Sequence, residues 1–259
     1  MNHSKKIKIG IIVGIAVVLI AVIVGTAIGI LLSGRASEPN PLPDGFTVTA
    51  HTGCMDTEQN TLESLQAALD SGAQTVEFDI RFLADGTPVL AHDAEEKSAD
   101  SPKAIDALSM VAEYPGITIN LDLKEYTPLE RLLADVEVAG MMDRVFYTGV
   151  DAEHIDAVRA ATPDIPCYLN VSMNPLRMRS TAYLEEIVQQ CLDHGAIGVN
   201  CNYRYNSEKL VELCHAQGLL VSAWTVDNAN QMDIQLDIAP DNITTRRPDI
   251  LLEKANAHI

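Results

Sequence analysis

Basic residues are scarce in this chain of 259 residues. Lysine and arginine together number 18, against 36 aspartate and glutamate residues, so the formal net charge is −18. An acidic surface repels the backbone of a nucleic acid, and the shortage of cations therefore argues against nucleic acid as a partner. Any phosphate group that the protein handles must be attracted by a few local cations or by a bound metal ion.

The cysteines lack any recognisable pairing. None forms a Cys-x-x-Cys motif, and none combines with histidine at a spacing that suits zinc. We therefore expect small buried side chains rather than a disulfide framework. The five are Cys54, Cys167, Cys191, Cys201 and Cys214. Cys54 lies beside the candidate site described below, but no base accompanies it in a motif, so we do not expect a nucleophile there.

A segment without charge, residues 9–32, stands near the N-terminus. As a helix its 24 residues would extend about 36 Å, enough to cross a hydrocarbon core of about 30 Å. It is longer than the apolar core of a cleaved signal peptide, the alternative interpretation. Lysines crowd the preceding segment 1–8, so the positive-inside rule predicts a cytoplasmic N-terminus and an extracytoplasmic remainder. We therefore predict a single-pass membrane protein.

Two further features accompany this predicted anchor. The spacings Gly10-x-x-x-Gly14 and Gly25-x-x-x-Gly29 weakly indicate a homodimer through the membrane helix. Residues 33–45 then carry alternating prolines, which favour a stiff, extended linker. We predict one folded domain over residues 46–259.

Short β-type runs alternate with helical periodicity throughout this domain. The expected strands are 46–51, 75–83, 118–124, 144–148, 166–172, 196–203, 219–226 and 242–245. Eight strands alternating with about eight helices predict an α/β fold, a (β/α)8 or TIM barrel. An open doubly wound sheet is the alternative, but no glycine-rich turn follows the first strand.

Several helix boundaries are also readable. Asn60-x-x-Glu63 and Thr127-x-x-Glu130 resemble capping boxes, the second with Pro128 at the first helical position. Ser71-Gly72 and His194-Gly195 stand where helices should end.

Charged residues gather at the predicted carboxyl ends of the first three strands, the end where such barrels hold their active sites. Glu77 and Asp79 are two residues apart on one strand and leave the same face. Asp122 and Lys124 repeat this relation on the next strand. Three carboxylates in one small volume repel each other unless a cation lies between them. Oxygen ligands without cysteine predict Mg²⁺ or Ca²⁺.

The motifs resemble the glycerophosphodiester phosphodiesterase family from residue 51 to residue 249. That family has His-Arg-Gly, Glu-Asn-Thr, Glu-x-Asp, an Asp-Gly turn, His-Asp, Glu-x-Lys and a Trp-Thr strand. The matching residues here are His51-Thr52-Gly53, Gln59-Asn60-Thr61, Glu77-Phe78-Asp79, Asp85-Gly86, His92-Asp93, Asp122-Leu123-Lys124 and Trp224-Thr225.

The resemblance implies a role for each of these residues. His51 and His92 would be the acid/base pair, and Glu77, Asp79 and Asp122 the metal ligands. Lys124 would contact the phosphate and Trp224 would line the pocket. The implied reaction hydrolyses a glycerophosphodiester to glycerol 3-phosphate and an alcohol.

Three departures from the family pattern stand out. Thr52 replaces the arginine that follows the first histidine, and Arg81 or Arg246 could supply the lost cation. Asp122 replaces the usual glutamate and is shorter by about 1.5 Å. Only residues 94–103 separate His92-Asp93 from the next helix, which predicts an open pocket.

These departures leave two other functions in view. One is a phospholipase D- or C-like barrel that acts on lysolipids, which the open pocket and the predicted anchor would suit. The other is a barrel that binds a phosphate ligand without catalysis, which the loss of the arginine would suit.

Overall fold

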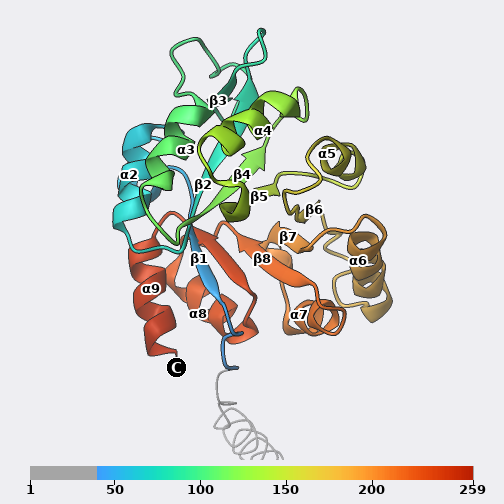
Figure 1. Cartoon of the computed structure of the whole chain (residues 1–259). Coiled ribbons are helices and arrows are strands. Elements are labelled where there is room, and N and C mark those ends of the chain that lie inside the picture. The colour runs from blue at the N-terminus through green and yellow to red at the C-terminus, as the bar shows by residue number, and fades with distance from the viewer. Residues whose placement is uncertain (1–39, 259) are drawn as a thin grey trace, which may run out of the picture. The chain divides into compact units, whose positions relative to one another are not determined.

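A computed structural model describes residues 40–258 of the chain (Figure 1). The predicted N-terminal segment 1–8, the predicted membrane span 9–32 and the linker as far as residue 39 lie outside the described residues. The anchor, its topology and the homodimer therefore stay predictions. Among residues 40–258, no helix combines the length and apolar character that crossing a membrane requires.

Eight parallel strands build the wall of a barrel in the described part of the chain. Their hydrogen-bonded order is β5-β4-β2-β1-β9-β8-β7-β6, and β3 (Pro88–Leu90) adds an antiparallel hairpin to β2. The eight are β1 (Thr47–Ala50), β2 (Thr75–Phe82), β4 (Thr118–Leu123), β5 (Val145–Thr148), β6 (Leu169–Val171), β7 (Gly198–Asn202), β8 (Leu220–Trp224) and β9 (Asn242–Thr245). Every strand predicted from the sequence is present, shortened by up to three residues at an end.

The two outer strands of this order nearly close the barrel. Tyr147 of β5 forms a parallel bridge with Cys167, just before β6. The Tyr168 N–H donates to the Tyr147 carbonyl at 2.9 Å, and the Asn170 N–H donates to the Val150 carbonyl at 2.7 Å. The strands follow one another around a circle, which confirms the predicted (β/α)8 barrel and excludes the open doubly wound sheet.

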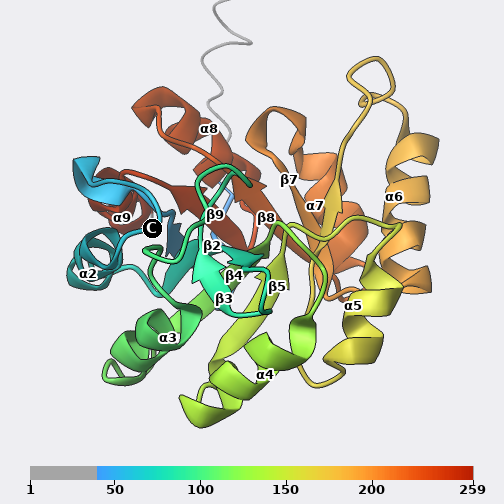
Figure 2. The same ribbon diagram turned by 90° about the horizontal axis from the view of Figure 1, so that it is seen from above.

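A helix follows each of the eight strands, and the helices surround the strands in the view along the barrel (Figure 2). Each buries an apolar stripe, as α6 does with Leu184, Ile187, Val188 and Cys191. The helices are α2 (Leu62–Asp70), α3 (Ala104–Ala112), α4 (Leu129–Val138), α5 (Ile155–Ala161), α6 (Thr181–Asp193), α7 (Glu208–His215), α8 (Ala229–Ile238) and α9 (Pro248–Ala257). All five cysteines are buried and free, as predicted.

The structure corrects both predicted capping boxes. The cap of α2 is Thr61, whose hydroxyl accepts the Ser64 N–H at 3.1 Å. Asn60 instead adopts a left-handed backbone conformation, with φ of 57°, and its side chain binds Asp79. Helix α4 begins at Leu129 because Pro128 is still extended, and no side chain caps it. The predicted helix ends at Gly72 and Gly195 are correct, since both glycines have positive φ.

The chain enters the barrel at the end opposite the carboxyl ends of the strands. The Asn40 side-chain amide donates to the Asp237 carbonyl near the end of α8, and His258, after α9, donates to the Asn40 carbonyl. The compact unit thus begins at Asn40, six residues before the predicted start of the domain. The functional residues all lie at the other end.

Candidate active site

A pocket of about 440 Å³ opens at the carboxyl ends of the barrel strands. All but one of the predicted site residues line it, and the exception, Asp79, is buried and contacts Lys124. The lining residues that matter below are His51, Glu77, Arg81, His92, Asn120, Asp122, Lys124, Thr148, Asn170, Asn200, Trp224 and Arg246. Residues predicted from scattered motifs are therefore brought together in one place.

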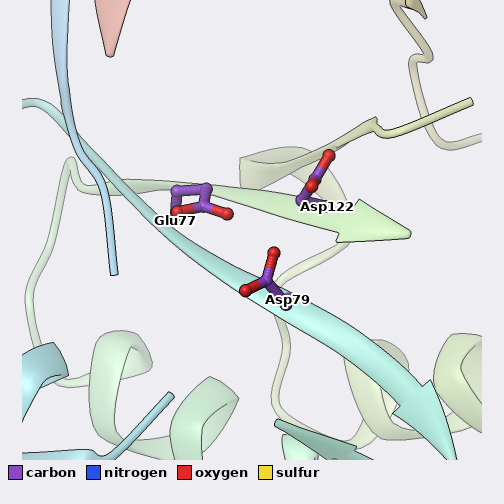
Figure 3. Close-up of side chains that lie close together, drawn as sticks. All are labelled: Glu77, Asp79 and Asp122. Atoms are coloured by element: carbon purple, nitrogen blue, oxygen red, sulfur yellow. The ribbon is translucent and has the colours of Figure 1, made fainter. Parts of the chain in front are cut away.

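Three carboxylates converge beside this pocket from two neighbouring strands (Figure 3). Glu77 and Asp79 come from β2, and Asp122 comes from β4, where it pairs in register with Asp79. Each residue offers an oxygen, and these oxygens all lie within 4.8 Å of one another. The shorter side chain of Asp122 does not keep it from joining the group.

The group carries more negative charge than its neighbours compensate. Burial raises the pKa of Glu77 well above its ordinary value, and repulsion from Asp79 and Asp122 raises it further. A hydrogen bond from the Thr52 N–H, at 2.9 Å, only partly opposes this rise. Ionised Glu77 is thus unfavourable in the metal-free protein.

Lys124 supplies the one ammonium group in contact with these carboxylates among the described residues. Its Nζ lies 3.1 Å from Asp79 and 2.5 Å from Asp122. Burial lowers the pKa of Lys124, but the two carboxylates outweigh burial and raise it overall, so the side chain stays charged.

The donor set suits a hard divalent cation. Two oxygens on opposite sides of one Mg²⁺ or Ca²⁺ ion lie roughly 4–5 Å apart, twice the usual metal–oxygen distance. Separations within 4.8 Å are compatible with three oxygens that share one such ion. A divalent ion would also relieve the charge that raises the pKa of Glu77.

His51 follows β1 and lies against the carboxylates. Its Nδ1 is 2.7 Å from the Thr52 carbonyl and 3.6 Å from Glu77. A carbonyl oxygen can only accept, so Nδ1 carries the proton and Nε2 of the neutral ring keeps a free lone pair. Burial lowers the pKa of His51, and the positive charge of Arg246 lowers it further. The neutral ring is therefore favoured near neutral pH.

His92 has a different environment. It follows β3, its side chain is about half exposed, and its Nδ1 lies 2.9 Å from an Asp93 carboxylate oxygen. The pocket thus holds two histidines, one enclosed and one at the edge.

Thr52, which the resemblance matches to an arginine of the family pattern, does not line the pocket. It is buried, and its hydroxyl accepts the Asn60 N–H at 2.6 Å. Asn60 in turn donates to an Asp79 oxygen at 2.8 Å. Thr52 therefore supports the turn that holds a carboxylate, and it contributes no cation.

Two arginines line the pocket, and each already has an anionic partner. Arg81 donates to Glu125 at 2.9 Å and to the His92 carbonyl at 2.8 Å. Arg246 forms an ion pair with Asp227 at 3.0 Å. Both contribute positive potential to the pocket, weakened by these carboxylates.

Two other predicted positions can be placed. Trp224, the last residue of β8, lines the pocket, and its indole N–H is buried without a partner among residues 40–258.

Burial raises the pKa of the Cys54 thiol to about 11, so this cysteine has no nucleophilic character at neutral pH.

Sequence reasoning missed the neutral polar residues of the pocket. Asn120, Thr148, Asn170 and Asn200 face its interior from β4, β5, β6 and β7. The signal was present, because Asn120 is two residues before Asp122 and so shares its strand face. A neutral amide within a strand, unlike a carboxylate or a histidine, carries no motif of its own.

Comparison with known proteins gives the family. A sequence profile of the glycerophosphoryl diester phosphodiesterase family matches residues 49–112 and 128–250, more than half of the chain. A glycerophosphodiester phosphodiesterase of Caldanaerobacter subterraneus is 22% identical over 234 residues, covering 79% of this chain and 96% of the relative. Human glycerophosphodiester phosphodiesterase 1 is 45% identical over 62 residues, which cover 24% of this chain and 19% of the relative.

Solved structures show the same fold. A putative glycerophosphoryl diester phosphodiesterase of Silicibacter pomeroyi superposes with a TM-score of 0.73 at 20% identity, covering 85% of this chain and 95% of the other. A phosphodiesterase of Oleispira antarctica, solved in complex with the product sn-glycerol-3-phosphate, superposes with a TM-score of 0.64 at 23% identity, covering 83% and 97%.

Proposed function

Since this chain belongs to the glycerophosphoryl diester phosphodiesterase family, a family of phosphoric diester hydrolases, we propose that it hydrolyses water-soluble glycerophosphodiesters to glycerol 3-phosphate and an alcohol with the help of a divalent cation. The observation that carries this proposal is the meeting of three carboxylates, a lysine and two histidines at one pocket.

Glu77, Asp79 and Asp122 are the proposed ligands of Mg²⁺ or Ca²⁺, which when bound would neutralise charge on the phosphoryl oxygens. Lys124 is the proposed ligand of the same phosphate; its support is that its ammonium group lines the pocket and contacts Asp79 and Asp122. Arg81 and Arg246 add positive potential that attracts the anionic substrate to an otherwise acidic protein.

His51 and His92 are the proposed acid/base pair. One accepts a proton from the attacking hydroxyl or water, and the other donates a proton to the oxygen of the departing alcohol. Enclosed His51 keeps a free lone pair on Nε2, and exposed His92 is held by Asp93. The two rings thus have the different environments that opposite proton transfers need.

A lysolipid substrate is the alternative that the open mouth would favour. An acyl chain requires a largely apolar channel, and this pocket offers Leu123, Tyr126 and Trp224 among mostly polar lining residues. The loop 94–103 is as short as predicted, since α3 begins at Ala104. The polar lining therefore supports a small, hydroxylated substrate over a lysolipid.

A binding barrel without turnover is the second alternative, motivated by Thr52. The retained histidines and Lys124 argue against it, because ligand binding alone does not require proton-transfer groups. Metal and phosphate binding without hydrolysis would establish this alternative.

We also propose that residues 9–32 form a retained, single-pass membrane anchor with the barrel outside the cytoplasm. Support comes from the length of the charge-free run and from Lys5, Lys6 and Lys8 before it. Protease protection in sealed vesicles tests this topology: a barrel digested only after lysis of inside-out vesicles supports it, and digestion before lysis contradicts it.

The test of the activity uses the full chain with glycerophosphocholine, glycerophosphoethanolamine and lysophosphatidylcholine, each with Mg²⁺, Ca²⁺ or chelator. We expect release of glycerol 3-phosphate from the first two, only with metal. His51→Ala should lower kcat/KM by about 10²- to 10⁴-fold. His194→Ala, which alters a partly exposed histidine paired with Asp156 outside the pocket, is the matched control and should leave the rate unchanged. Turnover of the lysolipid alone would reverse the choice of substrate.

A further inference from the structure

Residues 92–101, which we call the His92 segment, lie in the connection between β3 and α3 and begin with one of the two proposed proton-transfer groups. From residue 92 to residue 100 every residue is exposed except Lys97. An exposed connection buries little apolar surface that could hold it in place. The position of His92 therefore depends on polar contacts.

Two hydrogen bonds join the His92 segment to the rest of the described domain. Arg81 Nε donates to the His92 carbonyl at 2.8 Å, and Lys97 Nζ donates to a Glu125 oxygen at 2.6 Å. The other hydrogen bonds of the segment, within the part of the chain that the structure describes, run between its own residues. These two contacts are therefore what fixes the segment against the barrel.

Both contacts lead to Glu125, which lies two residues beyond the end of β4. Its Oε1 accepts from the Lys97 ammonium group and, at 2.9 Å, from the Arg81 guanidinium group. Its Oε2 accepts the Phe82 N–H at 2.9 Å, which holds the carboxylate at the end of β2. One carboxylate therefore holds both of the side chains through which the His92 segment is attached.

Partial burial makes this cluster stronger than an ordinary surface ion pair. The side chains of Arg81, Lys97 and Glu125 are 16%, 27% and 25% exposed. Burial raises the pKa of Glu125, but hydrogen bonds from Lys97, Phe82 and Arg81 outweigh burial and lower it overall, so the carboxylate is ionised at neutral pH. A neutral amide of the same shape would lose the attraction for both cations.

From these contacts we infer that Glu125 is a positioning residue, which holds His92 at the edge of the active site through Arg81 and Lys97. The inference rests on the proposed function, in which His92 transfers a proton, and extends it to a residue that does not line the pocket. It also gives Arg81 a second role, because its guanidinium group joins Glu125 to the backbone of His92.

The experiment measures kcat and KM of the full chain with glycerophosphoethanolamine and saturating Mg²⁺ or Ca²⁺. A displaced His92 impairs proton transfer more than binding, so Glu125→Gln should lower kcat about 30-fold and change KM by less than about threefold. Because Glu125 acts through His92, the double variant Glu125→Gln/His92→Ala should stay within about twofold of His92→Ala. Glu186→Gln, which breaks the exposed pair between α6 and Arg177 of the preceding loop, is the matched control and should leave both constants unchanged.

Limited proteolysis gives a second measurement, which needs no turnover. Endoproteinase Glu-C cleaves after glutamate, and Glu95 and Glu96 lie within the His92 segment. Cleavage there should be about tenfold faster in Glu125→Gln than in the native protein or in Glu186→Gln, because the segment is released. Should Glu125→Gln fail to fold, Lys97→Met removes one of the two contacts and should also speed cleavage and lower kcat, by about fivefold each.

Three results would overturn the inference. They are a native kcat in Glu125→Gln, unchanged cleavage of the His92 segment, and a double variant that is slower than His92→Ala by the full Glu125→Gln factor. The last result would show that Glu125 acts independently of His92. If the native protein hydrolyses no glycerophosphodiester, the proposed function fails, whereas faster cleavage in Glu125→Gln still supports the attachment of the segment by Glu125.

Discussion

The two sides of the pocket differ in kind. Strands β1, β2 and β4 lead to charged groups, namely His51, Glu77, Asp79, Asp122 and Lys124. Strands β6 to β9 contribute neutral groups, namely Asn170, Asn200, Trp224 and Thr244, and one cation, Arg246, follows β9. We call these the charged side and the neutral side. Under the proposed function, the charged side holds the groups that would act on the phosphate.

The two sides also differ in energetic cost. On the charged side, burial and mutual repulsion raise the pKa of Glu77, so the arrangement is strained without a cation. On the neutral side the deeper groups satisfy one another, as Asn242 does with Thr49 and Ser222. The residues proposed to bind metal therefore lower the stability of the metal-free protein. The residues of the neutral side lower it less.

The largest expected effect comes from breaking the charged side. Asp122→Asn keeps the shape of the side chain and removes one charge from the carboxylate group, so kcat/KM with glycerophosphoethanolamine should fall about 10³-fold. Steady-state kinetics measure this loss, and Asp233→Asn, in an exposed pair with Lys254, is the control. If Asn200→Ala lowers kcat as much as Asp122→Asn does, the division between the sides is wrong.

The next largest effect on activity is expected at Gly149, which follows β5, between the charged side and the neutral side. Gly149 has φ of +79°, and a Cβ there would lie 2.4 Å from the Leu123 carbonyl and 2.7 Å from an Asp122 oxygen. Gly149→Ala should displace Asp122 and lower kcat about 10²-fold.

Gly218→Ala separates this steric effect from backbone strain. Gly218 also has positive φ, of +72°, but no atom lies within 4 Å of its Cβ position. Activity should survive there with a loss of stability of about 1 kcal/mol. A Gly149→Ala protein with native kcat would show that the position of Asp122 is not critical.

A smaller effect is expected from the cation beyond β9. Arg246→Ala should raise KM about tenfold, because one positive charge at the pocket is lost. It should also raise the pKa of His51 back toward 6.5, since Arg246 helps to lower it. NMR titration of the His51 ring measures the shift, with Arg177→Ala, in an exposed pair with Glu186, as control. If the pKa of His51 is the same in Arg246→Ala as in the native protein, Arg246 does not lower it.

The smallest expected effect is on stability without metal. The folded-state pKa of Glu77 is raised, so the folded protein binds a proton that the unfolded chain releases above the ordinary value of 4.5, and stability falls as pH rises. Glu77→Gln removes this loss and should raise the thermal midpoint at pH 8 by about 2–4 °C while abolishing activity.

The Glu77→Gln difference should shrink toward pH 4.5, and added Mg²⁺ or Ca²⁺ should stabilise only the native protein. Differential scanning calorimetry measures both trends. Glu253→Gln, at an exposed position, should change neither. A Glu77→Gln protein that is less stable than the native one at pH 8 without metal would contradict the strain assigned to the charged side.

Much of this arrangement is readable from the sequence. Short runs rich in β-branched and aromatic residues predicted every barrel strand, because such residues suit strands that are buried on both faces. The carboxylates and histidines were found because they occupy strand ends in family order. Asn60 was misjudged as a helix cap, since a local rule cannot show that its side chain reaches Asp79, 19 residues away.

The sequence by itself therefore determined the barrel, the order of its elements and the identity of the charged residues, because periodicity and motif spacing are local properties of the chain. Only the tertiary structure decided that Thr52 does not line the pocket, that Arg81 and Arg246 already hold carboxylates, and that Glu125 joins Arg81 to Lys97. These outcomes depend on contacts between strands and loops far apart in the sequence. Such contacts are fixed by the closure of the barrel, which no single segment encodes.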